Sequence, residues 1–142
     1  MCNQCDYLNL LQSVGVSGTP RREMVLKAIG NHDGVLRPSE ILERVRKQTS
    51  INRVTLYRIL DLLVEKGLIR RLSAGDRTFR YGLAATPNHP DHAHFHCLQC
   101  GRMECLEPRG VPLGGENSRR LRSVTVQYVE IRFDGVCQTC QS

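Results

Sequence analysis

Apolar side chains recur every three to four residues through the first half of the chain, a pattern typical of amphipathic helices. It predicts four helices, which cover residues 6–14, 20–30, 38–47 and 53–66. Thr19-Pro20 fits an N-cap followed by a first helical residue, where the missing proline N–H costs no hydrogen bond. Asn52 is an equally suitable N-cap for the fourth helix, and Gly67 ends that helix.

The apolar period then shortens to two, which indicates β-strands. Residues 68–72 and 77–81 are predicted to form a hairpin around a turn at 73–76. Helices 38–47 and 53–66 are joined by a short turn, and a hairpin follows them directly. This order is that of a winged helix-turn-helix, so residues 1–85 are expected to form a DNA-binding domain.

Residues 86–91 contain two prolines and few apolar side chains, so we interpret them as a hinge. The rest of the chain, 92–142, has short alternating stretches with room for one brief helix at 116–122. The strands expected there cover residues 92–97, 102–106, 123–128 and 129–134. The predicted fold class is α+β, with an N-terminal winged helix-turn-helix and a small C-terminal α/β domain.

Charge separates the two halves of the chain. The formal net charge is +6, and residues 1–85 hold 14 basic and 8 acidic side chains, whereas residues 86–142 hold 6 of each. The imbalance favours a polyanionic partner for the first half, although a solvated basic face would look the same. Since no apolar run is long enough to span a membrane and no secretory signal is evident, we expect a cytoplasmic protein without a membrane partner.

In a helix-turn-helix, the N-terminal residues of the second helix reach base edges in the major groove. Arg53 can form a fork on guanine, and Asn52 and Thr55 can bond to other bases. Helix N-termini and hairpin arginines commonly hold phosphates or enter the minor groove. The predicted DNA-binding residues are Arg21, Arg22, Asn52, Arg53, Thr55, Tyr57, Arg58, Arg77 and Arg80.

The chain has seven cysteines, and a reducing compartment favours metal binding over disulfides. The most specific motif in the chain is two Cys-x-x-Cys pairs separated by 36 residues. They consist of Cys97 with Cys100 and of Cys137 with Cys140. Two such pairs can surround a Zn²⁺ ion tetrahedrally, which predicts a structural zinc site. Two redox pairs, or unrelated buried thiols, are the alternative. A third pair, Cys2 and Cys5, could bind a metal or form a disulfide, but it is expected to have no structural role.

Four histidines stand directly before the first cysteine pair: His89, His92, His94 and His96. The last three would share one face of a strand, because side chains alternate along it. Cys105 on the next strand could complete a second metal site, and imidazole ligands do not identify the metal. An exposed polar edge strand is the competing interpretation.

Taken in order, these motifs resemble the ferric uptake regulator (Fur) family of metal-dependent repressors. The matching segments are Thr19–Arg22, Val54–Arg58 with Leu63, Gly67–Ile69, His92–Gly101 and Phe133–Cys140. The resemblance implies a homodimer in which winged helices bind a palindromic DNA operator and C-terminal domains dimerise. It also implies structural zinc on the four cysteines, and a regulatory divalent metal, Zn²⁺ or Fe²⁺, near His92 and His94.

The chain departs from the family pattern at several expected ligand positions. Gly82 and Ala84 stand where the family offers an acidic residue or cysteine, and Ala93 and Val129 replace other usual ligands. Cys105, after Glu104, is similar to a zinc-sensing branch of the family. The sequence thus predicts a repressor that controls zinc or iron homeostasis.

Other function classes remain open at this level. A thiol- or peroxide-responsive regulator of the same fold would use cysteines such as Cys105. A zinc-dependent hydrolase would use His92, His94 and a water molecule, but no general base is evident near them. A metal-storage or scaffold protein would have no use for a basic winged helix.

Overall fold

A computed structural model describes residues 5–32, 34–74, 78–84, 93–106, 121–125 and 130–142. The chain divides into two compact units, Met1–Asp91 and His92–Ser142. Both units combine helices with strands, which confirms the expected α+β class. The predicted hinge, residues 86–91, lies outside the described residues.

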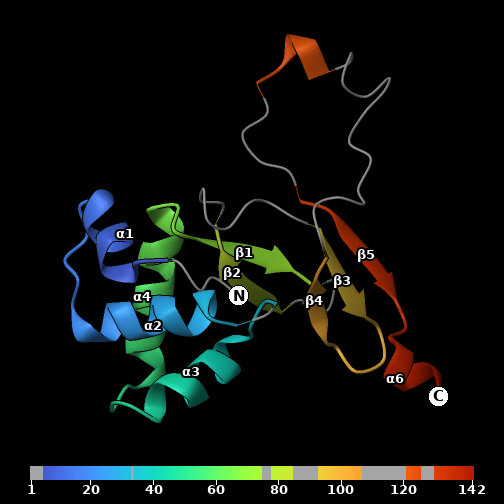
Figure 1. The fold of residues 1–142 in the computed structure, drawn as a ribbon, viewed down its shortest axis with the longest axis horizontal. Coiled ribbons are helices and arrows are strands. Elements are labelled where there is room, and N and C mark those ends of the chain that lie inside the picture. The colour runs from blue at the N-terminus through green and yellow to red at the C-terminus, as the bar shows by residue number, and fades with distance from the viewer. Residues whose placement is uncertain (1–4, 33, 75–77, 85–92, 107–120, 126–129) are drawn as a thin grey trace. The chain divides into compact units, whose positions relative to one another are not determined.

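The first unit contains four helices followed by a hairpin (Figure 1). The helices are α1 (Tyr7–Ser13), α2 (Pro20–Gly30), α3 (Pro38–Arg46) and α4 (Arg53–Glu65). The Thr19 hydroxyl accepts a hydrogen bond from the Arg22 N–H at 3.4 Å, and the Asn52 side chain accepts one from the Thr55 N–H at 2.8 Å. These bonds satisfy N–H groups that have no partner inside the helix, which is why α2 and α4 begin where the sequence predicts.

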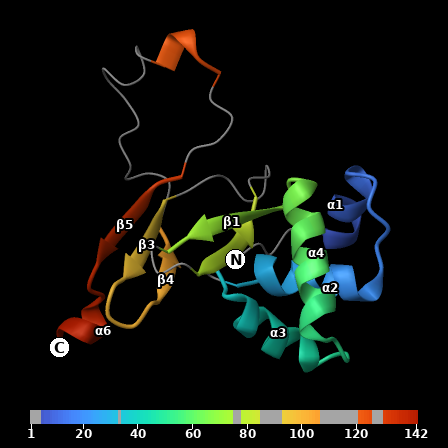
Figure 2. The same ribbon diagram turned by 180° about the vertical axis from the view of Figure 1, so that it is seen from behind.

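Helix α4 packs against α2, α3 and strand β1. Figure 2 shows α4 in front of α2. Leu56, Leu60 and Leu63 of α4 are fully buried, together with Leu26 of α2 and Ile41 of α3. This core holds the helices in place, because buried leucines contribute about 2 kcal/mol each by leaving water. It therefore fixes which side of α4 faces solvent.

The hairpin consists of β1 (Ile69–Ser73) and β2 (Phe79–Leu83), paired antiparallel from Ile69 opposite Leu83 to Ser73 opposite Phe79. Strand β2 begins at Phe79 rather than at residue 77, the predicted start. Its other edge pairs with Leu36, through reciprocal backbone hydrogen bonds of 3.0 and 2.8 Å between Leu36 and Tyr81. The hairpin is thus joined to the segment that leads into α3.

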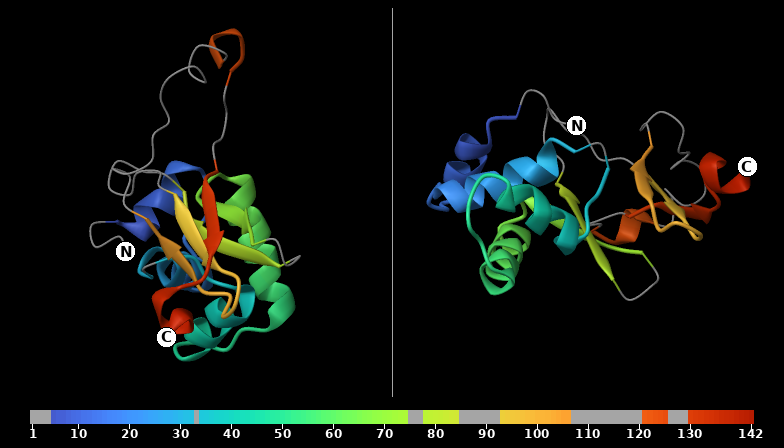
Figure 3. Two further views of the ribbon diagram at one scale, coloured as in Figure 1. Left: turned by 90° about the vertical axis from the view of Figure 1, so that its right-hand side faces the viewer. Right: turned by 90° about the horizontal axis from the view of Figure 1, so that it is seen from below.

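The second unit contains a three-stranded sheet in the order β4-β3-β5 (Figure 3). Its elements are β3 (His94–Cys97), β4 (Met103–Cys105), the 3₁₀ turn η2 (Leu121–Ser123), β5 (Arg132–Gly135) and α6 (Gln138–Gln141). Strand β3 pairs antiparallel with β4 and parallel with β5. Both cysteine pairs follow strands that run in the same direction, so they lie at the same end of the sheet.

The second unit differs from the predictions at several places. Residues 123–125 of the expected strand 123–128 end a 3₁₀ turn and continue without strand pairing, while 126–128 lie outside the described residues. Helix α6 was not predicted, because four residues are too few to show a helical period. Among the described helices, none is both long enough and apolar enough to span a bilayer.

Candidate metal centre and nucleic-acid interface

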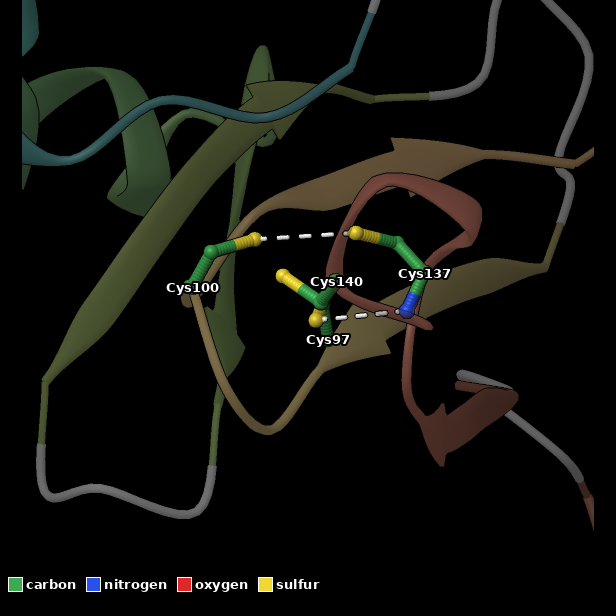
Figure 4. Close-up of side chains that lie close together, drawn as sticks. All are labelled: Cys97, Cys100, Cys137 and Cys140. Atoms are coloured by element: carbon green, nitrogen blue, oxygen red, sulfur yellow. Dashed lines mark hydrogen bonds between the residues drawn. The ribbon is translucent and has the colours of Figure 1, made fainter. Parts of the chain in front are cut away.

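Four cysteine sulfurs from two distant segments converge at one end of the second sheet (Figure 4). Cys97 ends β3, Cys100 follows in the next turn, Cys137 is the N-cap of α6 and Cys140 lies within α6. All four Sγ atoms lie within 4.8 Å of one another, and those of Cys100 and Cys137 are 3.9 Å apart. A tetrahedral zinc ion with Zn–S bonds of ~2.3 Å requires sulfurs ~3.8 Å apart, so this donor set fits zinc.

Backbone hydrogen bonds hold the first cysteine pair in a tight turn. The Gly101 N–H donates to the Cys97 carbonyl at 2.9 Å, and the Cys97 N–H donates to the Arg102 carbonyl at 2.9 Å. Gly101 has φ of +73°, a left-handed conformation that glycine adopts without a steric penalty. These contacts place Cys97 and Cys100 side by side at the end of β3.

The second pair is attached to the first through sulfur. The Cys137 N–H donates to Sγ of Cys97 at 3.3 Å, and the Cys140 N–H donates to the Cys137 carbonyl at 3.0 Å. The Leu98 N–H donates to the Gly135 carbonyl at 2.7 Å, which continues the β3–β5 ladder up to the site. Cys97 is fully buried and Cys137 is 9% exposed, so the cluster is closed on the side that faces the sheet.

The thiols differ in their readiness to lose a proton. Hydrogen bonds from the backbone of Cys100 and of Cys137 stabilise the thiolate of Cys97 and lower its pKa to about 6, against the opposing effect of burial. Cys140 lies beside the Cys137 sulfur, and this contact, together with burial, raises its pKa to about 12. At neutral pH the cluster therefore offers a thiolate at Cys97 and a thiol at Cys140.

The predicted regulatory ligands do not gather in the same way. His89 and His92 lie outside the described residues. His94 on β3 stands opposite Cys105 on β4, and His96 stands opposite Met103. Within the described ranges, the four-cysteine cluster is the only group of three or more possible ligands close enough to share an ion.

His96 has a partner that sequence reasoning missed. Its ring is 4% exposed, and Nδ1 lies 3.3 Å from Oδ1 of Asp134, the residue in register with it on β5. Arg132 bonds both carboxylate oxygens of Asp134, at 2.8 and 3.0 Å, and with His96 it holds the pKa of that carboxyl below its usual value. Only the β3–β5 register, which the sequence pattern does not show, could have identified this pair.

The N-terminal half of α4 presents most of the predicted DNA-binding side chains. Arg53, Tyr57 and Arg58 are exposed, and the neighbouring Val54 is 61% exposed despite being apolar. Thr55 is half-buried, and Asn52 is exposed while its oxygen caps the helix. These residues occupy the first two turns of one helix, whose opposite face is anchored in the core.

The arginines outside α4 are placed in three different ways. Arg21 is exposed, whereas Arg22 is half-buried and donates to the Ser17 carbonyl at 3.1 Å. Arg77 lies outside the described residues. Arg80 departs from the expectation: it is 1% exposed in β2 and hydrogen-bonds to Thr78, so we remove it from the candidate interface.

An open groove beside the N-terminus of α4 adds residues that the sequence pattern did not single out. It measures about 610 Å³ and has a polar lining, formed by Arg21, Arg46, Thr49, Ser50, Ile51, Asn52 and Thr55. Nε of Arg46 donates to the Ile51 carbonyl at 3.0 Å and so fixes the turn between α3 and α4. With two arginines and no carboxylate in its lining, the groove suits an anion.

Comparison with known proteins places this arrangement in a family. The model of the ferric uptake regulator family matches residues 13–132. Among curated proteins, the peroxide operon regulator of Bacillus subtilis is 25% identical over 136 residues, covering 95% of this chain and 91% of that protein. The ferric uptake regulation protein of the same organism is 26% identical over 132 residues, covering 92% and 89%.

A solved structure agrees with this at the level of the fold. The ferric uptake regulator Fur of Helicobacter pylori superimposes with a TM-score of 0.69 at 22% identity, covering 94% of this chain and 88% of that one. Because 94% of the chain is covered, the match includes parts of both units. The chain therefore belongs to the ferric uptake regulator family, whose members are transcriptional regulators and not enzymes.

Proposed function

We propose that the protein is a homodimeric, metal-responsive repressor that binds a palindromic operator in double-stranded DNA. The observation that carries this proposal is the exposure of the first two turns of α4, with Arg53 and Arg58 on the surface and Val54 61% exposed. An arginine can form a fork on guanine, and an apolar side chain can contact a thymine methyl group. An exposed valine on a helix otherwise anchored in a core is explained by such a contact.

Two metal sites belong to the proposal. The cysteines Cys97, Cys100, Cys137 and Cys140 would hold a structural Zn²⁺, which joins the two ends of the second unit without an open coordination position. A regulatory divalent ion, Zn²⁺ or Fe²⁺, would be held near His92 and His94, with His89, His96 and Cys105 as further candidates. Of these, His96 would have to leave Asp134, so it is the weakest candidate.

Regulation follows from linkage between the metal and DNA sites. If the chain binds the regulatory ion more tightly in the arrangement that also binds DNA, then occupancy raises DNA affinity by the ratio of the two affinities. In a two-fold dimer, the two α4 helices must meet half-sites about one helical turn apart. The operator is therefore expected to be an inverted repeat.

Gel-shift titration on a metal-defined protein tests this function. The full chain should shift a duplex selected from a randomised pool when Zn²⁺ or Fe²⁺ is present, and a chelator that removes the regulatory ion should weaken the shift at least fivefold. Metal content measured before and after chelation shows whether one tightly held ion remains. A chain that shifts no duplex under any metal condition would refute the proposal.

A peroxide- or thiol-responsive regulator is the second candidate. It is favoured by the exposure of Cys105, which lies outside the four-cysteine cluster, and by the similarity to a peroxide operon regulator. In that case hydrogen peroxide would abolish the shift by the wild-type chain, and Cys105→Ser would keep it. If the chain is instead a metal-responsive repressor, the Zn²⁺-loaded wild type and Cys105→Ser should both keep their DNA affinity after peroxide treatment.

A further inference from the structure

A second groove lies on another face of α4, between that helix, the start of α3 and the hairpin. It measures about 400 Å³. Its lining residues come from three elements: Arg37, Pro38, Ser39 and Leu42 at α3, Arg53, Leu56 and Tyr57 on α4, and Thr78, Phe79 and Tyr81 at β2. It thus combines two arginines with three aromatic rings and contains no carboxylate.

Two of the lining aromatics are exposed although they are largely apolar. Phe79 is 48% exposed and Tyr57 is 41% exposed, whereas Tyr81 at the base of the groove is 3% exposed. The groove therefore offers an apolar wall beside positively charged side chains. That combination suits a ligand with alternating apolar and anionic parts, such as the sugars and phosphates of a nucleic-acid strand.

The two grooves flank α4. At 100° per residue, Arg53 and Tyr57 lie about 100–160° around the helix from Asn52 and Thr55, which line the first groove. A helix is ~10–12 Å wide with its side chains, close to the ~12 Å width of the DNA major groove, so a helix in that groove has one backbone strand on each side. Two basic grooves on either side of α4 match this geometry.

Arg71 holds the aromatic wall in place from outside the groove. Its guanidinium lies 5.2 Å from the ring centre of Phe79 and 5.9 Å from that of Tyr81, and it pairs with Asp61 of α4 at 3.0 Å. Cation–π contacts form at such distances. Since Arg71 is not among the residues that line the groove, it connects the hairpin to α4 without occupying the space between them.

We infer that this second groove binds one sugar–phosphate strand of the DNA, with Arg37 on a phosphate and Phe79 packed on a deoxyribose, and that Arg71 positions Phe79. The inference rests on the proposed DNA-binding function. It adds a contact that is independent of base sequence and that lies between the recognition helix and the hairpin. Arg37 and Phe79 are the residues on which it is tested.

The experiment measures Kd for the zinc-loaded full chain against salt concentration, with a mixed-sequence 40-bp duplex and with a duplex selected from a randomised pool. Arg37→Gln should weaken binding to both duplexes about eightfold per bound protomer at 0.1 M salt. The slope of log Kd against log salt concentration should fall by about one ion per protomer. Phe79→Ala should weaken both about fivefold and leave the salt dependence unchanged. Lys66→Gln, at the far end of α4, is the charge-matched control and should have little effect.

A double variant isolates the role of Arg71. If Arg71 acts only by positioning Phe79, Arg71→Gln should weaken binding without changing the salt dependence. The double variant Arg71→Gln/Phe79→Ala should then bind no more weakly than Phe79→Ala alone. If Arg71→Gln is additive and makes the salt dependence shallower, Arg71 contacts phosphate itself and the positioning role is wrong. Thermal unfolding of each variant identifies any general loss of folding, and Arg71→Lys, which keeps the charge, should restore part of the affinity.

The outcomes separate this inference from the proposed function. If the wild-type chain binds neither duplex, the function fails. If the wild type binds but Arg37→Gln and Phe79→Ala match Lys66→Gln, the function stands and the groove inference is overturned. A groove built for a small molecule or a peptide would give this second result.

Discussion

Replacing Cys97 by serine should abolish metal binding by the four-cysteine cluster and unfold the second unit. Cys97 is fully buried at the end of β3, and its sulfur accepts the Cys137 N–H that attaches α6 to the sheet. Structural zinc sites contribute about 10–16 kcal/mol to the folding of small domains, which matches or exceeds the whole free energy of unfolding of most domains. The loss of one of four ligands removes enough of this energy to leave the second unit unfolded.

Metal content by mass spectrometry and far-ultraviolet circular dichroism measure both effects. The helices of the first unit should persist, because their core consists of residues from that unit alone. Cys105→Ser is the matched control, since it removes an exposed thiol one strand away and should keep one tightly held zinc equivalent and the wild-type circular dichroism spectrum. A Cys97→Ser protein that kept one equivalent of zinc and the wild-type thermal midpoint would refute the structural role of the cluster. In the proposed homodimer, loss of dimerisation should accompany unfolding.

Arg58→Ala should weaken binding to all DNA sequences by about tenfold per bound unit at 0.1 M salt, which makes about a hundredfold for a dimer. The side chain is exposed in the second turn of α4, beyond the residues at the helix tip, where it suits a phosphate. The loss of one phosphate contact per unit also makes the salt dependence of Kd shallower by about one ion per unit.

Comparison with Arg53→Ala separates phosphate binding from base recognition. Arg53 is the first residue of α4, and its loss should cost about 1–3 kcal/mol on the selected duplex but much less on a mixed-sequence duplex. Fluorescence anisotropy gives Kd of each variant and of the wild type on both duplexes, and so the loss of affinity on each duplex. If Arg58→Ala and Arg53→Ala discriminated equally between the duplexes, the assigned roles would be wrong.

The first unit could be predicted closely from sequence because its signals are local. Thr19, Asn52 and the prolines at helix starts act within three residues, and the stripe of Leu56, Leu60 and Leu63 repeats within one helix. The cysteine cluster was predictable for a different reason. Two residues between paired cysteines is a spacing typical of zinc sites, so the convergence of the two pairs could be predicted without knowing how the intervening chain folds.

Burial of Arg80 and pairing of His96 with Asp134 were not predictable in this way. A hairpin with alternating polar residues suggests an exposed Arg80, but β2 also pairs with Leu36 on its second edge, and four consecutive residues of the strand are buried. His96 meets Asp134 only because β3 and β5 run parallel in one specific register. Both depend on contacts between segments far apart in the sequence, and no local pattern contains them.

The parallel pairing of β3 with β5 also bears on how the protein is made. His96 and Asp134 are 38 residues apart, so a growing chain on the ribosome cannot form this ladder until residues past 135 have emerged. The four helices and the hairpin end at Leu83, so all of their residues emerge well before the segment that carries β5. A nascent chain should therefore carry a finished first unit before its second unit can bind a metal ion, so metal supply would act only on a late step of maturation.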